Sequence, residues 1–179
     1  YVNNNRLVVE ATGEKIVLNP SKQYFEPIVE TKILEKADAK IGYLYYDSYT
    51  ERSMDKLVEV FSRFKQENVN EVILDLRYNG GGFVKVMAYL CSILAPEILV
   101  SKKSLLLTEE WSPSMMEYYK RKGEDVNVYL DAKVPVNMNL KRIFILTSSI
   151  TASASEATII GLEAYDGIEV SQIGETTHG

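Results

Sequence analysis

Two short, almost wholly apolar segments constrain the fold of this chain more than any other feature. They are EVILDL at residues 71–76 and RIFILT at residues 142–147. Apolar runs of this length are typical of strands that are buried on both faces of a parallel sheet. A helical pattern follows each of them. Strands that alternate with helices predict an α/β fold, in which functional loops lie where strands end and helices begin.

Other segments complete this pattern. Apolar residues at helical spacing predict an amphipathic helix over residues 52–67, directly after a predicted strand, KIGYLYY, at 40–46. Further helices are predicted at residues 83–95, 112–123 and 153–165, and further strands at 97–101 and 168–174. The irregular segment 105–140 contains the helix at 112–123, which has Pro113 near its start and Gly123 at its end, and it is interpreted as an insertion or a lid over a site.

The first 38 residues are expected to form a separate N-terminal β segment and linker, and residues 39–179 the core. RLVVEATGEKIVLN at residues 6–19 predicts two short strands joined by a Thr12-Gly13 turn. Two prolines in PSKQYFEP at residues 20–27 indicate a linker. Because the chain begins without methionine and stops just after a turn signal, we expect it to be a piece of a longer protein.

Composition excludes some function classes. A net charge of −5 argues against nucleic-acid binding, which needs a basic face. The one basic cluster, Lys120-Arg121-Lys122, is too short to form such a face and is interpreted as a solvated helix end. The single cysteine, Cys91, lies in an apolar run and predicts a buried, inert thiol rather than a disulfide. We expect no metal and no cofactor.

Three consecutive glycines, Gly80–Gly82, follow the first buried strand in the sequence DLRYNGGG. Glycine accepts positive φ angles and lets another chain approach its backbone closely. Backbone amides in such a loop can point at an anion or at a developing oxyanion. A plain flexible turn is the alternative interpretation, and the loop lacks the Gly-Lys-Ser/Thr of a phosphate-binding P-loop.

A cluster of hydroxyl-bearing residues, TSSITASASE at residues 147–156, follows the second buried strand. Ser153 and Glu156 have the spacing of a capping box, in which each side chain binds the other residue's backbone amide. Ala152 and Ala154 leave room for a substrate carbonyl beside Ser153, and the Ala154 amide lies where it could stabilise an oxyanion. Local pattern alone therefore leaves both a helix cap and a nucleophile open.

Taken together, these loops resemble those of the C-terminal processing peptidases, or tail-specific proteases. These serine peptidases have a Clp-protease/crotonase-like core and usually an accessory PDZ domain. KIGYLYYDSY resembles the opening core strand of the family, VILDLRYNGGG its D-L-R-x-N-x-G-G loop, and TASASEATIIGLEAY with IGETTHG its T-A-S-A-S-E helix and G-E/D-T-x-x-G turn. The three matches occur in the family's order between Lys40 and Gly179.

The resemblance implies that Ser153 is the nucleophile and that the amides of Ala154 and of Gly81 or Gly82 form the oxyanion hole. Ser155 would be structural and Glu156 a helix cap. In the family, a lysine directly after the final glycine is the general base, and a nearby glutamine positions it. Burial beside the serine can supply the depressed pKa that such a lysine needs.

This chain departs from the family pattern at its end, because neither the lysine nor the glutamine is present up to Gly179. His178, the sole histidine, is an alternative base, but it aligns with a variable position of the G-E-T-x-x-G turn. We therefore expect a lysine base beyond residue 179 and an inactive 179-residue chain. Asp75 and Arg77 are expected to hold the glycine loop, with Asp75 as a triad acid the less favoured alternative.

Three functions remain open on this resemblance. The first is a serine endopeptidase that cleaves protein or peptide substrates near their C-termini. The second is a non-catalytic, peptide-binding or scaffolding homologue that has lost the base. The third is a crotonase-type acyl-CoA enzyme, which the T-A-S-A-S-E helix disfavours because that chemistry needs no serine there. The family also implies an extracytoplasmic location, periplasmic or envelope-attached, and makes the N-terminal strands a candidate end of a PDZ domain.

Overall fold

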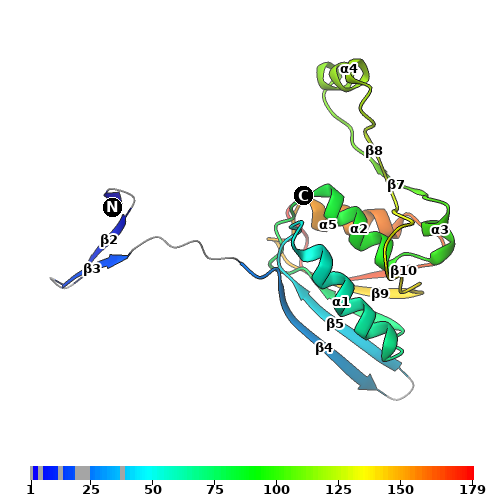
Figure 1. Cartoon of the computed structure of the whole chain (residues 1–179), viewed down its shortest axis with the longest axis horizontal. Helices are drawn as coiled ribbons and strands as arrows, with labels where there is room; N and C mark the ends of the chain where they lie inside the picture. Colours follow the sequence, from blue (N-terminus) through cyan, green and yellow to red (C-terminus); the bar gives the residue numbers. More distant parts are fainter. Residues whose placement is uncertain (1, 4–5, 12–13, 19–24, 37–38) are drawn as a thin grey trace.

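The computed structural model describes residues 2–3, 6–11, 14–18, 25–36 and 39–179 (Figure 1). The largest of its sheets has five strands, in the order β10-β9-β6-β5-β4. The four strands β5 (Ala39–Tyr46), β6 (Glu71–Asp75), β9 (Arg142–Thr147) and β10 (Glu169–Gly174) run parallel, and β4 (Ile28–Lys36) pairs antiparallel with β5. The α/β fold predicted from the alternating pattern is therefore confirmed.

Three helices build the core against this sheet: α1 (Ser53–Gln66), α2 (Val84–Leu94) and α5 (Ala154–Glu163). In Figure 1 they lie beside one another over the strands, and α2 contacts both of the others. Leu44, Leu74 and Ile145 are fully buried on the sheet face that meets them. Ile73, Phe144 and Leu146, on the opposite face of β6 and β9, are only partly buried. These strands are therefore covered more on one face than on the other, contrary to the prediction for EVILDL and RIFILT, although Asp75 is itself buried.

Two elements differ from the sequence-based prediction. Strand β4 had not been predicted, and its pairing with β5 means that the sheet begins at Ile28, upstream of the predicted core start at residue 39. Its sequence IVETKILEK is rich in charge, as is usual for an edge strand, and this obscures the strand pattern. Residues 97–101 were predicted as a strand but form α3 (Glu97–Ser101), because Pro96 opens a helical turn in which Leu99 N donates to Pro96 O.

The predicted insertion forms an arm that consists of β7 (Leu105–Thr108), α4 (Pro113–Lys122) and β8 (Asn127–Tyr129). β7 and β8 pair antiparallel, and α4 caps their far end, extending away from the other helices (Figure 1). The predicted helix ends are confirmed: Pro113 begins α4, and Gly123 ends it in the left-handed conformation with φ 68°. Because α4 has no buried residue, the arm does not close over the core as the lid interpretation requires.

The base of the arm is fixed to α5. Tyr165, just after α5, donates its hydroxyl to Leu105 O at 2.5 Å, and the Leu106 side chain packs against Gly161. A Cβ at Gly161 would lie 2.8 Å from Leu106, so the glycine allows this close approach.

The N-terminal strands β1 (Val2–Asn3), β2 (Arg6–Ala11) and β3 (Glu14–Leu18) form a three-stranded antiparallel sheet of their own, as two of them were predicted to do. The predicted Thr12-Gly13 turn and most of the predicted linker at 20–27 lie outside the described residues. The division of the chain into segments 1–38 and 39–179 stays a prediction.

Candidate active site

The two loops singled out by their composition follow neighbouring strands, β6 and β9. Because these strands are parallel and paired, their carboxyl ends meet at one edge of the sheet. Thr151 Oγ1 donates to Leu76 O at 2.8 Å, and Ala152 N donates to Asn79 O at 3.2 Å. The glycine loop (Leu76–Phe83) and the serine loop (Ser148–Ser153) are thus hydrogen-bonded to one another.

Ser153 is exposed at the first turn of α5 and has an unusual backbone, with φ 54° and ψ −116°. Glu156 accepts a hydrogen bond from the Ser153 amide at 2.7 Å, which is the reach-back half of the predicted capping box. The Ser153 carbonyl begins the helix by accepting from Ala157 N at 2.9 Å. The Ser153 side chain is therefore exposed, while the Ser153 backbone is bonded to the first turn of α5.

Gly81 lies directly against Ser153. A Cβ at Gly81 would stand 2.8 Å from Ser153 Cβ and 3.0 Å from Ala154 N, and the φ of 103° at Gly81 is one that side chains disfavour. The glycine loop is therefore on the same side of the sheet as Ser153, as predicted. A larger residue at this position would displace the serine.

The backbone amides of the three predicted oxyanion-hole residues differ in their partners. The Gly81 amide donates to Asn79 Oδ1 at 2.8 Å. Within the part of the chain that the structure describes, the amides of Gly82 and Ala154 have no hydrogen-bond partner. Gly82 is the better of the two glycine candidates for this reason, because a donor must be free to receive an oxyanion.

Asn79 and Tyr49 are contacts of the site to which the sequence assigned no role. Asn79 is fully buried, and besides binding the Gly81 amide it donates from Nδ2 to Tyr46 O at 3.0 Å. An asparagine before a glycine run is a known turn signal, and the Asn79–Gly81 bond is such a turn. No local pattern indicates Tyr49, which reaches the glycine loop from the segment that follows β5.

Asp75 is fully buried and is held at both carboxylate oxygens. Arg77 donates to them at 2.9 and 2.7 Å, and the Tyr43 hydroxyl donates at 2.7 Å. Burial acts to raise the pKa of Asp75, but the bonds from Arg77 and Tyr43 outweigh it, so the pKa lies below its ordinary value. These contacts match the structural role expected for the pair, and Asp75 makes no hydrogen bond to a histidine or to Ser153.

The end of the chain returns to the serine loop. His178 N donates to Thr151 O at 2.9 Å, and Gly179 N donates to Glu156 Oε1 at 2.9 Å. Glu156 therefore binds Ser153 with one carboxylate oxygen and Gly179 with the other. The His178 side chain is exposed and makes no hydrogen bond to Ser153.

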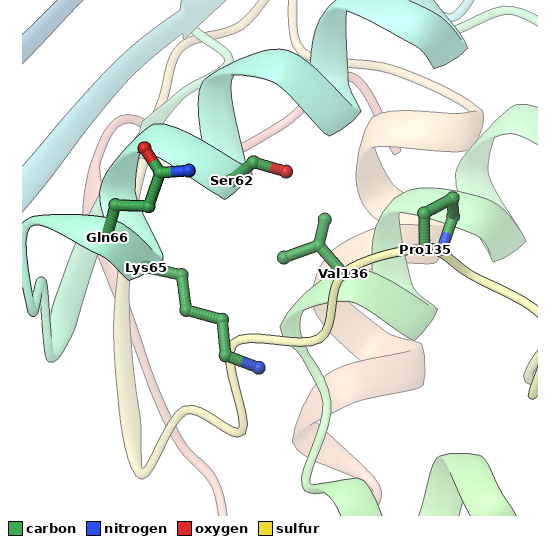
Figure 2. Close-up of a pocket in the computed structure, with 5 residues that line it drawn as sticks. All are labelled: Ser62, Lys65, Gln66, Pro135 and Val136. Atoms are coloured by element: carbon green, nitrogen blue, oxygen red, sulfur yellow. The ribbon is translucent and has the colours of Figure 1, made fainter.

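Clefts lie both beside this edge and away from it. Arg77 and Tyr78 of the glycine loop face Ser148, Ser149 and Ile150 of the serine loop across a cleft of about 410 Å³. A second pocket, of about 290 Å³, lies between the end of α1 and residues Pro135 and Val136 (Figure 2). Its Lys65 is bonded to Asn137 O, and neither loop contributes to it.

Three further observations bear on the predicted chemistry. The Cys91 thiol is fully buried, and burial raises its pKa to about 12, which makes it inert as predicted. Among the described residues there is no group of three or more His, Cys, Asp or Glu side chains placed to hold a metal ion. None of the described helices is both long and apolar enough to cross a membrane.

The family model that matches this chain is that of peptidase family S41, over residues 40–179. The chain belongs to peptidase family S41. The match starts at the strand KIGYLYY and includes both loops, and it confirms the resemblance inferred from the three motifs. No curated protein matches the chain by sequence.

Solved structures extend the S41 assignment to the fold. A protein from Bacteroides fragilis NCTC 9343, described as a candidate S41 protease, is 26% identical, with a TM-score of 0.77 over 97% of this chain and 47% of that one. A photosystem II D1 C-terminal processing protease is 18% identical, with a TM-score of 0.64 over 97% of this chain and 44% of that one. The S41 chain described here thus spans just under half the length of either protein.

Proposed function

We propose that this chain carries the nucleophile and the oxyanion hole of a serine endopeptidase of the C-terminal processing type. Membership of a peptidase family supports hydrolysis of peptide bonds and favours it over acyl-CoA chemistry. The observation that carries the proposal is the contact of Gly81 with the exposed Ser153 and with the amide of Ala154, which brings the glycine loop against the start of α5. Gly82, the next residue of this loop, supplies the second unpartnered amide.

In the proposed mechanism, Ser153 Oγ attacks the scissile carbonyl carbon, and the proton of the hydroxyl passes to a base. The carbonyl oxygen becomes an oxyanion between the amides of Gly82 and Ala154, where fixed donors stabilise it without reorganisation. The base is the lysine that follows Gly179 in the family pattern, positioned by a glutamine further on. Glu156 supports this arrangement, because it binds the backbone at both Ser153 and Gly179.

The substrate is proposed to be a protein or peptide cleaved near its C-terminus, the reaction named for the photosystem II D1 processing protease with the same fold. We further propose an extracytoplasmic location. The N-terminal strands are proposed as the end of a PDZ domain. The alternative function is that of a non-catalytic scaffolding homologue. Such a protein would bind peptides without cleaving them.

The proposal is tested in the full-length protein with Ser153→Ala. We expect peptide hydrolysis to be abolished, while loss of the serine from the helix start changes the free energy of unfolding by only about 1 kcal/mol. The matched control is Ser149→Ala, an exposed serine of the same loop, which should keep wild-type activity. Activity retained by Ser153→Ala but lost in Ser155→Ala would contradict the assignment. A wild-type protein that binds peptides but releases no product would favour the scaffolding alternative.

A further inference from the structure

The two amides of the proposed oxyanion hole belong to different loops, so something must fix the distance between them. Gly82 lies in the loop after β6, and Ala154 opens α5 after β9. Tyr49, in the segment between β5 and α1, contacts both the glycine loop and α5. It is fully buried, and its backbone and its side chain face different partners.

The Tyr49 backbone holds the glycine loop on both sides of Gly82. Tyr49 N donates to Gly81 O at 3.0 Å, and Tyr49 O accepts from Phe83 N at 2.9 Å. Because a trans peptide group is planar, its C=O and N–H point in opposite directions. Since Gly81 O points at Tyr49, the Gly82 N–H of the same peptide group must point away from Tyr49. Tyr49 thereby determines the direction of the unpartnered Gly82 amide.

The Tyr49 side chain reaches α5. Its hydroxyl lies 2.8 Å from Thr158 Oγ1, and Thr158 Oγ1 donates to Ala154 O at 2.9 Å. Thr158 has one hydroxyl hydrogen, which is used on Ala154, so Tyr49 is the donor to Thr158. Burial raises the pKa of the Tyr49 phenol well above its ordinary value, which keeps this donor protonated. The Tyr46 ring meets the Tyr49 ring edge-on at 4.8 Å and limits its movement.

We propose that Tyr49 is a positioning residue for the oxyanion hole, which sets the Gly82 amide and the first turn of α5 at a fixed separation. The proposal rests on the function proposed above. The backbone bonds of Tyr49 orient the Gly82 amide. The Tyr49 hydroxyl bonds Thr158, which in turn bonds the first turn of α5, where the Ala154 amide lies. Nothing in this role requires contact with the substrate, so loss of the hydroxyl is expected to affect the transition state more than ground-state binding.

The test is Tyr49→Phe in the full-length protein, which removes the hydroxyl and keeps the ring and the backbone bonds. We expect kcat per titrated active site to fall by a factor of about ten to a hundred, because small misplacements of catalytic groups have effects of that size. KM should change less than about two-fold. Affinity for a peptide boronate, whose tetrahedral adduct places an oxygen in the hole, should fall by the same factor as kcat/KM.

Tyr46→Phe is the matched control. Tyr46 is also fully buried, and its hydroxyl bonds Ser53 Oγ at 2.6 Å at the start of α1, not a residue of either loop. The Phe variant keeps the ring that packs on Tyr49 and the carbonyl that binds Asn79. We expect a comparable decrease in stability with kcat unchanged. Thr158→Val interrupts the same connection from the other end, so the double variant with Tyr49→Phe should be little worse than Thr158→Val alone. Thr158→Val also serves if Tyr49→Phe fails to fold.

The outcomes separate this inference from the proposed function. If Ser153→Ala is inactive while Tyr49→Phe and Thr158→Val keep kcat within about two-fold of wild type, the positioning role is wrong and the peptidase assignment stands. A kcat that falls equally in Tyr49→Phe and Tyr46→Phe also overturns it, because the effect then follows from stability alone. If Ser153→Ala retains activity, the proposed function fails and the inference fails with it.

Discussion

At the scale of single residues, the site depends on backbone conformations that side chains rarely adopt. Ser153 has a positive φ together with a ψ of −116°, which lies outside the left-handed helical region. A conformation of this kind raises the free energy by about 1–3 kcal/mol and persists only where the surroundings enforce it. Here the bond to Glu156 and the Ala157 amide enforce it from the helix side. Asn68, Lys103 and Asn139 also have a positive φ, but they lie outside the candidate site, whereas Ser153 is the residue that we propose as the nucleophile.

The neighbouring glycines provide a paired prediction. Gly81→Ala would place a methyl group 2.8 Å from Ser153 Cβ at a φ of 103°, so we expect it to destabilise the protein by about 1–3 kcal/mol and to remove peptidase activity. Gly80→Ala is the control, since nothing lies within 4 Å of its added Cβ. Urea unfolding and a peptide-cleavage assay measure both effects. Equal behaviour of the two variants would show that the Gly81 contact is unimportant.

At the scale of elements, a helix or strand was predicted correctly where residues within it or next to it determine its structure. α4 has a proline at its start and a glycine at its end, and both ends were predicted from these residues. The five residues of α3 are too few for a period to be recognised, and β4 owes its place to pairing with β5. The same limit applies to the site. Ser153 and the glycine loop have a local pattern, whereas Tyr49 acts through residues distant in the chain.

Asp75, at the end of β6, leads to a prediction about how the free energy of unfolding depends on pH. The folded-state pKa of Asp75 lies below its ordinary value of 3.8, so its bonds to Arg77 and Tyr43 contribute stability in full above that pH. This contribution is lost as the pH falls through the lower, folded-state pKa. We therefore expect the free energy of unfolding of Asp75→Asn to change less than that of wild type between about pH 5 and pH 2. Denaturant titrations at each pH test this, and parallel curves for the two proteins would contradict it.

At the scale of the whole molecule, the edge of the sheet brings together Ser153, which we propose as the nucleophile, the glycine loop and the segment that ends at Gly179. The base that we propose is the lysine of the family pattern. We predict that residues 1–179 alone do not cleave peptides, and that His178→Ala in the full-length protein cleaves at near the wild-type rate, because the exposed imidazole makes no hydrogen bond to Ser153. Both are measured with one peptide substrate. A 179-residue chain that is active and is silenced by His178→Ala would replace the lysine with a histidine base.

The bonds that join the glycine loop to the serine loop and to α5 also determine when the site can form as the chain folds. The bond from Ser155 Oγ to Asn79 O, 3.0 Å long, joins residues 76 positions apart in the sequence. Closing so large a loop has an entropic penalty, which the pairing of β6 with β9 helps to offset. No partly folded chain in which these strands are still apart can hold the serine against the glycines. Assembly of the site is therefore tied to the pairing of β6 with β9.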